Sequence, residues 1–182
     1  MHPPRKEKVV ASLTTIPSRL EHLHVALRSI FSQTVMPDKV ILYIGNDIEY
    51  DQIPDSVWDY HDMGLDIQKR PGNLRSHKKY YYACQEFPNH AVITLDDDWI
   101  YPPDLIASLI NSYRKYPDCV SANRVMEMKR DAFGKLLPFG KWETIRGKAI
   151  PPSLKMLQKR CDPTAIISPQ LSALESAIAS CF

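Results

Sequence analysis

The chain has 182 residues, and its 23 lysines and arginines nearly balance its 21 aspartates and glutamates, leaving a net charge near +2. This length suits one compact α/β domain and is short for two. The balanced charge gives no electrostatic reason to expect nucleic acid as a partner. No apolar run approaches the roughly 20 residues that a membrane span needs, and the first residues lack the apolar segment of a signal peptide.

The cysteines indicate neither a zinc site nor a disulfide-bonded protein. There are 4, widely scattered, and none forms the closely spaced pair that is typical of zinc sites. They also lack the spacing of a disulfide framework, so we expect reduced thiols. These features together predict a cytoplasmic protein.

The first part of the chain reads as strand, helix, strand. Residues 8–13 (KVVASL) predict a first strand, and Ser18 with Glu21 three positions later has the pattern of a capping box. Apolar residues then recur at helical spacing to about Gln33. Residues 39–44 (KVILYI) predict a second strand. This order predicts a right-handed parallel crossover.

The alternation continues through the middle of the chain. We expect a loop over 46–64 with a short helix near Val57, and then a strand over 65–69. A helix over 77–87 follows, with its apolar side formed by Tyr80, Tyr81, Cys84 and Phe87. After it come the acidic strand, a helix that begins after Pro102, Pro103 and Asp104, and a strand over 119–126. Strands alternating with helices predict a three-layer, Rossmann-like α/β fold with a mostly parallel central sheet.

The pattern weakens after residue 129. Residues 131–142 resemble a loop or an irregular hairpin, and residues 158–182 carry no glycine and no alternation of strands and helices. A short helix over 171–178 is the one element expected in this tail. We therefore expect an incomplete or irregular C-terminal part that adds little to the core.

The most informative segment is AVITLDDDWIYPP, residues 91–103. Four strand-forming residues run into Asp96, Asp97 and Asp98, and three adjacent carboxylates repel one another unless a cation or solvent intervenes. Because side chains alternate along a strand, we expect Asp96 and Asp98 to face one way and Asp97 the other. Carboxylate oxygens at the carboxyl edge of an α/β sheet suit a divalent cation that also binds phosphate oxygens. The alternative interpretation is a solvated acidic turn.

Over residues 8–129 this layout resembles the nucleotide-sugar glycosyltransferases of the GT-A fold, especially the family-2-like group that makes bacterial polysaccharides. The resemblance rests on the Asp-x-Asp motif at Asp96–Asp98 after an apolar strand, the proline-initiated helix behind it, and a first strand that ends in Thr14-Thr15-Ile16-Pro17. It implies transfer of a sugar from a nucleoside-diphosphate sugar to a polysaccharide or glycolipid acceptor. A saccharide or lipid-linked acceptor would also allow peripheral association with a membrane.

The resemblance implies roles for the acidic residues. Asp98 resembles the carboxylate that binds Mn²⁺ or Mg²⁺, and Asp96 resembles its partner near the ribose and the metal-bound waters. Such a cation neutralises the charge that develops on the departing diphosphate. Asp97 either contacts the residues that hold the cation, without binding the cation itself, or faces solvent.

Other residues match the family's nucleotide-binding positions. Thr14 and Thr15 either contact the nucleoside or cap the next turn. Asp47 follows the second strand, where the family often places an acid that reads the base, although the local sequence GNDIEYD departs from the usual double-Asp pattern. Lys78 either binds a phosphate as a mobile point charge or lies at an exposed helix start.

Three further residues leave two interpretations each. Arg19 either reaches the nucleotide or lies on a solvated helix face. Trp99 and Tyr101 either line a sugar pocket or pack beneath the acidic loop.

The family's general base comes from an acid well downstream of the metal motif, at a distance that lies beyond Phe182. We therefore expect a chain that is truncated, or changed in reading frame near Leu157. The implied division is an extension over 1–7, a nucleotide-sugar-binding core over 8–129, a partial acceptor-side region over 130–157 and a tail over 158–182.

Two alternatives follow from these features. The first is a non-catalytic remnant that binds nucleotide only. The second, ranked lower, is a phosphatase of the haloacid-dehalogenase type, which also places Asp-x-Asp after an apolar strand.

Overall fold

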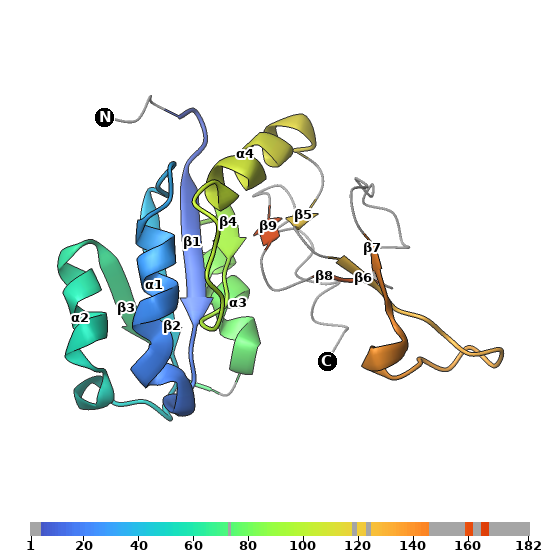
Figure 1. Cartoon of the computed structure of the whole chain (residues 1–182), viewed down its shortest axis with the longest axis horizontal. Coiled ribbons are helices and arrows are strands. Elements are labelled where there is room, and N and C mark those ends of the chain that lie inside the picture. The colour runs from blue at the N-terminus through green and yellow to red at the C-terminus, as the bar shows by residue number, and fades with distance from the viewer. Residues whose placement is uncertain are drawn as a thin grey trace.

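The computed structural model describes residues 5–72, 74–117, 120–122, 125–145, 159–161 and 165–167 (Figure 1). Its main sheet has six strands in the order β3-β2-β1-β4-β9-β5. In chain order these strands are β1 (Val9–Thr14), β2 (Lys39–Ile44), β3 (Leu65–Lys69), β4 (Ala91–Thr94), β5 (Ser121–Ala122) and β9 (Ala165–Ile167). The first four are mutually parallel, so the predicted parallel sheet is confirmed.

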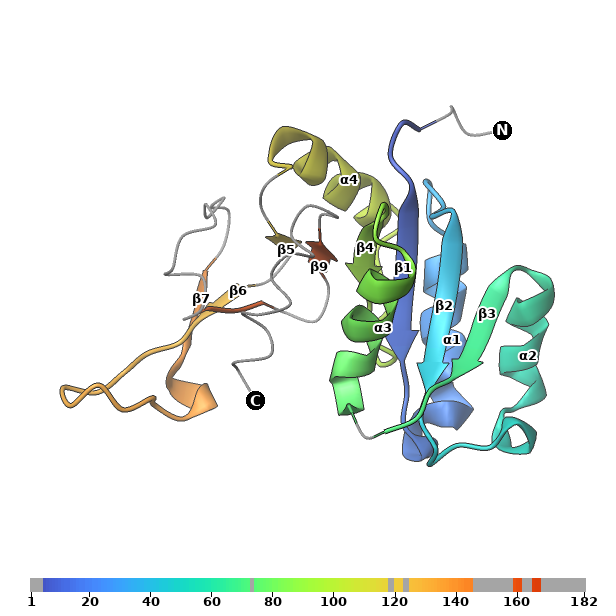
Figure 2. The same ribbon diagram turned by 180° about the vertical axis from the view of Figure 1, so that it is seen from behind.

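Helices cover both faces of this sheet. In chain order they are the 3₁₀ helix η1 (Pro17–His22), α1 (Leu23–Phe31), the 3₁₀ helix η2 (Tyr50–Gln52), α2 (Asp55–Asp62), the 3₁₀ helix η3 (Arg75–His77), α3 (Lys78–Glu86) and α4 (Leu105–Lys115). Figure 1 shows α1 and α2 in front of the sheet, and Figure 2 shows α3 on the opposite face. This is the predicted three-layer arrangement.

The two faces of the sheet differ in composition. The face toward α1, α2 and α4 carries the large apolar core, to which β1 contributes Val9, Ala11 and Leu13. The face toward α3 carries a much smaller apolar cluster. Helix α3 turns Lys78 and Lys79 inward beside Ala83. On the predicted apolar side, Cys84 and Phe87 are partly buried against this cluster, whereas Tyr81 is exposed. The long side chains of these two lysines follow the sheet toward its carboxyl edge.

The first helix also differs from its prediction. Its N-cap is Ile16, with Pro17 in the first turn and no side-chain hydrogen bond to the cap, so the predicted capping box at Ser18 and Glu21 is wrong. Because proline has a fixed φ and no backbone N–H, the chain opens here as the 3₁₀ helix η1. The α-helical part begins only at Leu23.

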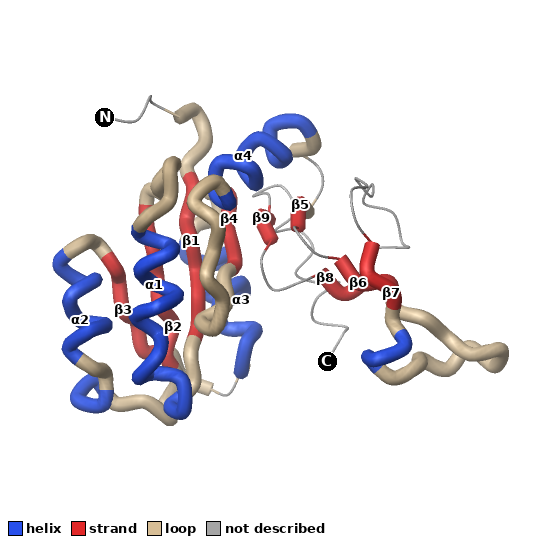
Figure 3. Tube along the Cα trace, in the orientation of Figure 1, coloured by secondary structure: helices blue, strands red, loops and turns tan. Residues whose placement is uncertain are grey.

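The strand predicted over 119–126 is two strands in different sheets. β5 belongs to the main sheet, whereas β6 (Val125–Glu127) pairs with β7 (Glu143–Ile145) and β8 (Lys159–Cys161) in a separate three-stranded sheet. Between β6 and β7 lie a loop, closed by a bridge from Arg130 to Leu136, and the 3₁₀ helix η4 (Phe139–Lys141) (Figure 3). That is the irregular hairpin predicted from the sequence.

The tail contributes more than its sequence indicates. β9 lies in the main sheet between β4 and β5 and pairs antiparallel with both. The expectation that residues 158–182 form no strand is therefore wrong, because β9 belongs to the main sheet and β8 supplies an edge of the second sheet. That this tail adds little to the core stays a prediction. The helix predicted over 171–178 lies outside the described residues. No helix in the described part of the chain combines the length and apolar character that crossing a membrane requires.

Candidate functional site

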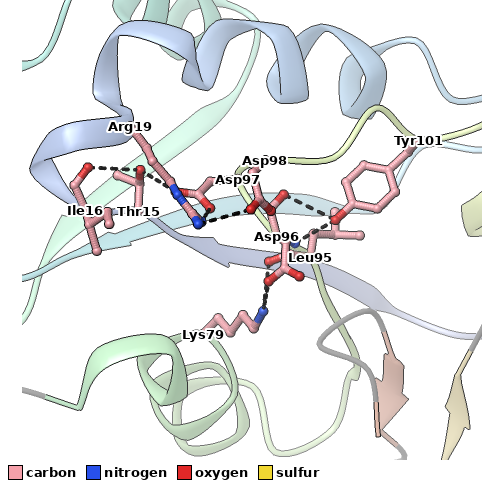
Figure 4. A network of polar contacts seen from close by, with 9 residues as sticks. All are labelled: Thr15, Ile16, Arg19, Lys79, Leu95, Asp96, Asp97, Asp98 and Tyr101. Carbon is pink, nitrogen blue, oxygen red and sulfur yellow. Dashed lines mark hydrogen bonds and ion pairs between the residues drawn. The ribbon is translucent and has the colours of Figure 1, made fainter. Parts of the chain in front are cut away.

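The acidic segment lies where the strand order of the main sheet reverses. From β1 the chain passes to β2 and β3 on one side, and it returns through α3 to β4 on the other side of β1. Ligands of open α/β sheets bind at such a point, outside the carboxyl ends of the strands. β4 ends at Thr94, and Asp97 and Asp98 lie in a turn (Figure 4). The alternation of a strand therefore does not extend over the three aspartates.

Asp97 is the buried member of the three, with a side chain that is 5% exposed. Its two carboxylate oxygens have different partners. Thr15 donates its hydroxyl hydrogen to Oδ2 at 2.7 Å, and Arg19 donates from Nη1 to Oδ1 at 2.7 Å. The solvent-facing alternative for Asp97 is wrong, because this carboxylate ties the acidic turn to the segment that follows β1.

Asp98 is open to solvent and shares the same arginine. Its side chain is 46% exposed, and its Oδ2 lies 3.1 Å from Nη2 of Arg19. One guanidinium thus bridges a buried carboxylate and an exposed one. Contact with Asp97 and Asp98 raises the pKa of Arg19 further above its already high value, so this cation is permanent.

Asp96 is held from the opposite face of the sheet. Lys79 of α3, which is 4% exposed, places Nζ 2.5 Å from Oδ1 of Asp96 and donates to the carbonyl oxygen of Leu95 at 3.3 Å. On the other side, the hydroxyl of Tyr101 accepts from the backbone N–H of Asp96 at 2.6 Å. Tyr101 is buried, so it packs beneath the acidic loop, whereas Trp99 is exposed.

A second cluster lies at the end of β2. A Cβ placed on Gly45 would meet Oδ1 of Asp47 at 2.4 Å and Nζ of Lys78 at 2.8 Å, so both side chains face the same point above this glycine. Lys78 is 3% exposed, so the exposed alternative predicted for it is wrong. The neighbouring lysines of α3 therefore diverge, with Lys78 reaching the end of β2 and Lys79 the end of β4 (Figure 4 shows the second).

The two threonines at the end of β1 have different surroundings. Thr14 donates its hydroxyl hydrogen to the carbonyl oxygen of Tyr43 in the adjacent strand at 2.7 Å. Thr15 instead points to Asp97. The site thus brings together Thr15 and the three aspartates, with Asp47 and Lys78 one strand away and Thr14 turned toward β2.

The positively charged side chains of Arg19 and Lys79 complete the site. The sequence leaves two interpretations of Arg19 and assigns no role to Lys79. They lie within ion-pair distance of the three aspartates and offset part of the repulsion between these adjacent carboxylates. The signal for both was the acidic run itself, since adjacent carboxylates that are partly buried favour cations nearby.

The carboxylates of Asp96 and Asp98 fit a divalent cation whose remaining ligands are phosphate oxygens and water. No group of three or more histidine, cysteine, aspartate or glutamate side chains in the described ranges is arranged to hold a metal. Asp98, however, presents a half-exposed carboxylate two residues after Asp96, whose carboxylate is 20% exposed. Mg²⁺ and similar hard ions are held by one or two carboxylates and complete their coordination with phosphate oxygens and water.

Comparison with known proteins supports this fold. No protein-family model matches the chain. Over 105 residues it is 28% identical to a glucosyl-dolichyl phosphate glucuronosyltransferase of Haloferax volcanii, a match that covers 57% of this chain and 33% of that protein. The match thus spans about a third of the length of this relative.

Solved structures with a similar fold include two glycosyltransferases. The mannosyltransferase PcManGT from Pyrobaculum calidifontis, in complex with GDP-Man and Mn²⁺, aligns with a TM-score of 0.52 and 16% identity over 70% of this chain and 37% of its own. S. aureus TarS 1–349 aligns with a TM-score of 0.58 and 16% identity over 94% and 49%.

A third structure shares the fold as well. The 4-diphosphocytidyl-2C-methyl-D-erythritol synthase from Anaerococcus prevotii aligns with a TM-score of 0.61 and 18% identity over 97% of this chain and 78% of its own. The chain therefore has an α/β fold like that of GT-A glycosyltransferases, as its sequence indicated, and the synthase has a similar one.

Proposed function

We propose that the chain binds a nucleoside-diphosphate sugar at the carboxyl edge of β1, β2 and β4 and transfers the sugar to a saccharide or lipid-linked acceptor. The observation that carries this proposal is the meeting of the acidic turn with Thr15, Arg19 and Lys79 at the point where the strand order reverses. The sequence match to a glucuronosyltransferase favours sugar transfer over the other reactions that such a fold supports.

The nucleoside end of the donor belongs at the end of β2. Gly45 has no side chain, and the space that a Cβ would occupy faces Asp47 and Lys78. A carboxylate accepts hydrogen bonds from the N–H groups of a base or a ribose hydroxyl, and a lysine ammonium binds a phosphate as a point charge. Thr14 and Thr15 line the path from this cluster to the acidic turn.

The diphosphate end belongs beside the acidic turn, where Asp98 with Asp96 would hold Mn²⁺ or Mg²⁺. When bound, the cation supplies positive charge next to the leaving diphosphate. Asp97 keeps the turn in place through Thr15 and Arg19, and Tyr101 fixes the backbone of Asp96. This division of labour gives each of the three aspartates a separate role.

Calorimetry on the whole chain tests the binding step. We expect UDP or GDP to bind measurably with Mn²⁺ present and much more weakly without it. Asp98→Asn removes the charge that attracts the cation and should abolish this metal dependence, whereas Asp62→Asn, an exposed aspartate at the end of α2, should not. If Asp98→Asn binds nucleotide with metal as tightly as the unmodified chain does, the assignment of the metal to Asp98 is wrong.

A second assay separates transfer from binding alone. Released nucleoside diphosphate is measured with a nucleotide sugar, with and without saccharide and lipid-linked acceptors. Release that requires the acceptor identifies a transferase, and a lipid-linked acceptor would bring the protein to a membrane surface from the cytoplasm. Binding without release would identify a nucleotide-binding protein. The phosphatase alternative is not favoured, since its nucleophilic aspartate lies near the beginning of the fold, whereas Asp96 follows the fourth strand.

A further inference from the structure

Arg19 joins two carboxylates that differ sharply in their exposure. Its Nη1 lies 2.7 Å from Oδ1 of Asp97, whose side chain is 5% exposed, and its Nη2 lies 3.1 Å from Oδ2 of Asp98, whose side chain is 46% exposed. Both arms belong to one rigid planar guanidinium. The arm toward Asp97 is therefore the strong one, and the arm toward Asp98 resembles an exposed ion pair that is worth little.

We propose that Arg19 is an exchangeable counter-ion of Asp98, and that this exchange couples binding of the divalent cation to binding of the nucleotide diphosphate. The inference rests on the proposed function. Without ligand, the Nη2 arm neutralises Asp98. When the cation binds Asp98, this arm leaves it and turns on the fixed contact with Asp97 toward the diphosphate.

The coupling follows from the charges of the site. A cation that arrives alone must displace the guanidinium arm and then lies beside a positive group that has lost its partner. A cation that arrives with a diphosphate brings negative oxygens that can accept from the freed arm. Arg19 is itself 47% exposed in its side chain, so this movement needs no rearrangement of the core.

The test measures Mn²⁺ affinity by electron paramagnetic resonance on the whole chain, with and without saturating UDP. The informative variant is Arg19→Lys, which keeps the positive charge but has one ammonium that cannot span two carboxylates. We expect this variant to bind Mn²⁺ alone up to about fivefold more tightly than the unmodified chain. The strengthening of Mn²⁺ binding by UDP should shrink by at least the same factor, and by reciprocity so should the strengthening of UDP binding by Mn²⁺.

Two further variants show whether Mn²⁺ affinity depends on the contact of Arg19 with both aspartates or only on its positive charge. Arg28→Lys, on the exposed side of α1, should change neither affinity. Arg19→Gln removes the charge altogether, so a gain in Mn²⁺ affinity with Gln but none with Lys would mean that charge alone matters and would overturn the inference. Thermal unfolding of each variant shows that the comparison is made on folded protein.

The outcomes also separate this inference from the proposed function. If the unmodified chain binds UDP with Mn²⁺ but Arg19→Lys leaves the metal-only affinity and the coupling unchanged, the exchange is refuted and the proposed function stands. If the unmodified chain binds no nucleotide with Mn²⁺ present, the proposed function fails, and the exchange fails with it.

Discussion

Replacing Lys79 tests how much its buried ion pair with Asp96 stabilises the protein. Lys79→Met keeps most of the side-chain volume but removes the ammonium that lies 2.5 Å from Oδ1 of Asp96 and 3.3 Å from the carbonyl oxygen of Leu95. Breaking a fully buried ion pair costs about 3–5 kcal/mol, and an exposed pair contributes about 0.2–1 kcal/mol. The side chain of Lys79 is 5% exposed and that of Asp96 is 20% exposed. We therefore expect a loss of about 2–3 kcal/mol in the free energy of unfolding.

Urea unfolding at neutral pH measures this loss, and the chain offers a matched control. Lys39 pairs with Asp66 at 2.8 Å, but these side chains are 41% and 32% exposed. Lys39→Met should therefore cost less than about 1 kcal/mol. If Lys79→Met costs no more than Lys39→Met, burial does not strengthen the pair at the acidic turn, and the reasoning is refuted. The double variant with Asp96→Asn should recover part of the loss, because a neutral amide needs no cation.

Three other substitutions give expected results. Thr15→Val removes the hydroxyl donor to the acidic turn and should cost about 1–3 kcal/mol in urea unfolding. Gly45→Ala places a Cβ 2.4 Å from one neighbouring side chain, so calorimetry should show weaker UDP binding than for Gly140→Ala, whose Cβ meets nothing within 4 Å. The hydrogen bond from Arg114 lowers the pKa of Glu7, so the stability that Glu7→Gln removes is present above pH of about 4 and should vanish as pH falls through that lowered pKa.

The edge strand β3 is only partly buried and alternates apolar with polar residues. The rest of the parallel core was readable from the sequence because β1, β2 and β4 are buried on both faces. Such strands appear as short runs of Val, Ile and Leu rather than as an alternation with polar residues. The predicted 39–44 and 65–69 coincide with β2 and β3, and the predicted 8–13 differs from β1 by one residue at each end. Turn residues and helical periodicity then placed the helices between these runs.

The inward face of α3 was not readable in the same way. Periodicity places aromatic residues inside and lysines outside, yet Lys78 and Lys79 are buried and Tyr81 is exposed. A lysine can bury its apolar stem and still deliver its ammonium to the edge of a sheet, so its burial depends on where that edge lies. The position of the edge follows from the assembled sheet and not from the helix sequence. The strand β9 was not predicted either, because its three residues are too few to show a hydrophobic period.

The acidic motif was readable from the sequence as a candidate site, but its counter-ions were not, because they lie far from it along the chain. Arg19 precedes Asp97 by 78 positions, and Lys79 precedes Asp96 by 17. Electrostatics nevertheless restricts the choice, since a carboxylate that is buried among adjacent carboxylates requires a cation within reach. In a parallel sheet, such cations come from the residues that follow a neighbouring strand or begin the helix leading into the acidic strand. Arg19 meets the first condition and Lys79 the second, so topology combined with charge balance could have selected both before any coordinates were known.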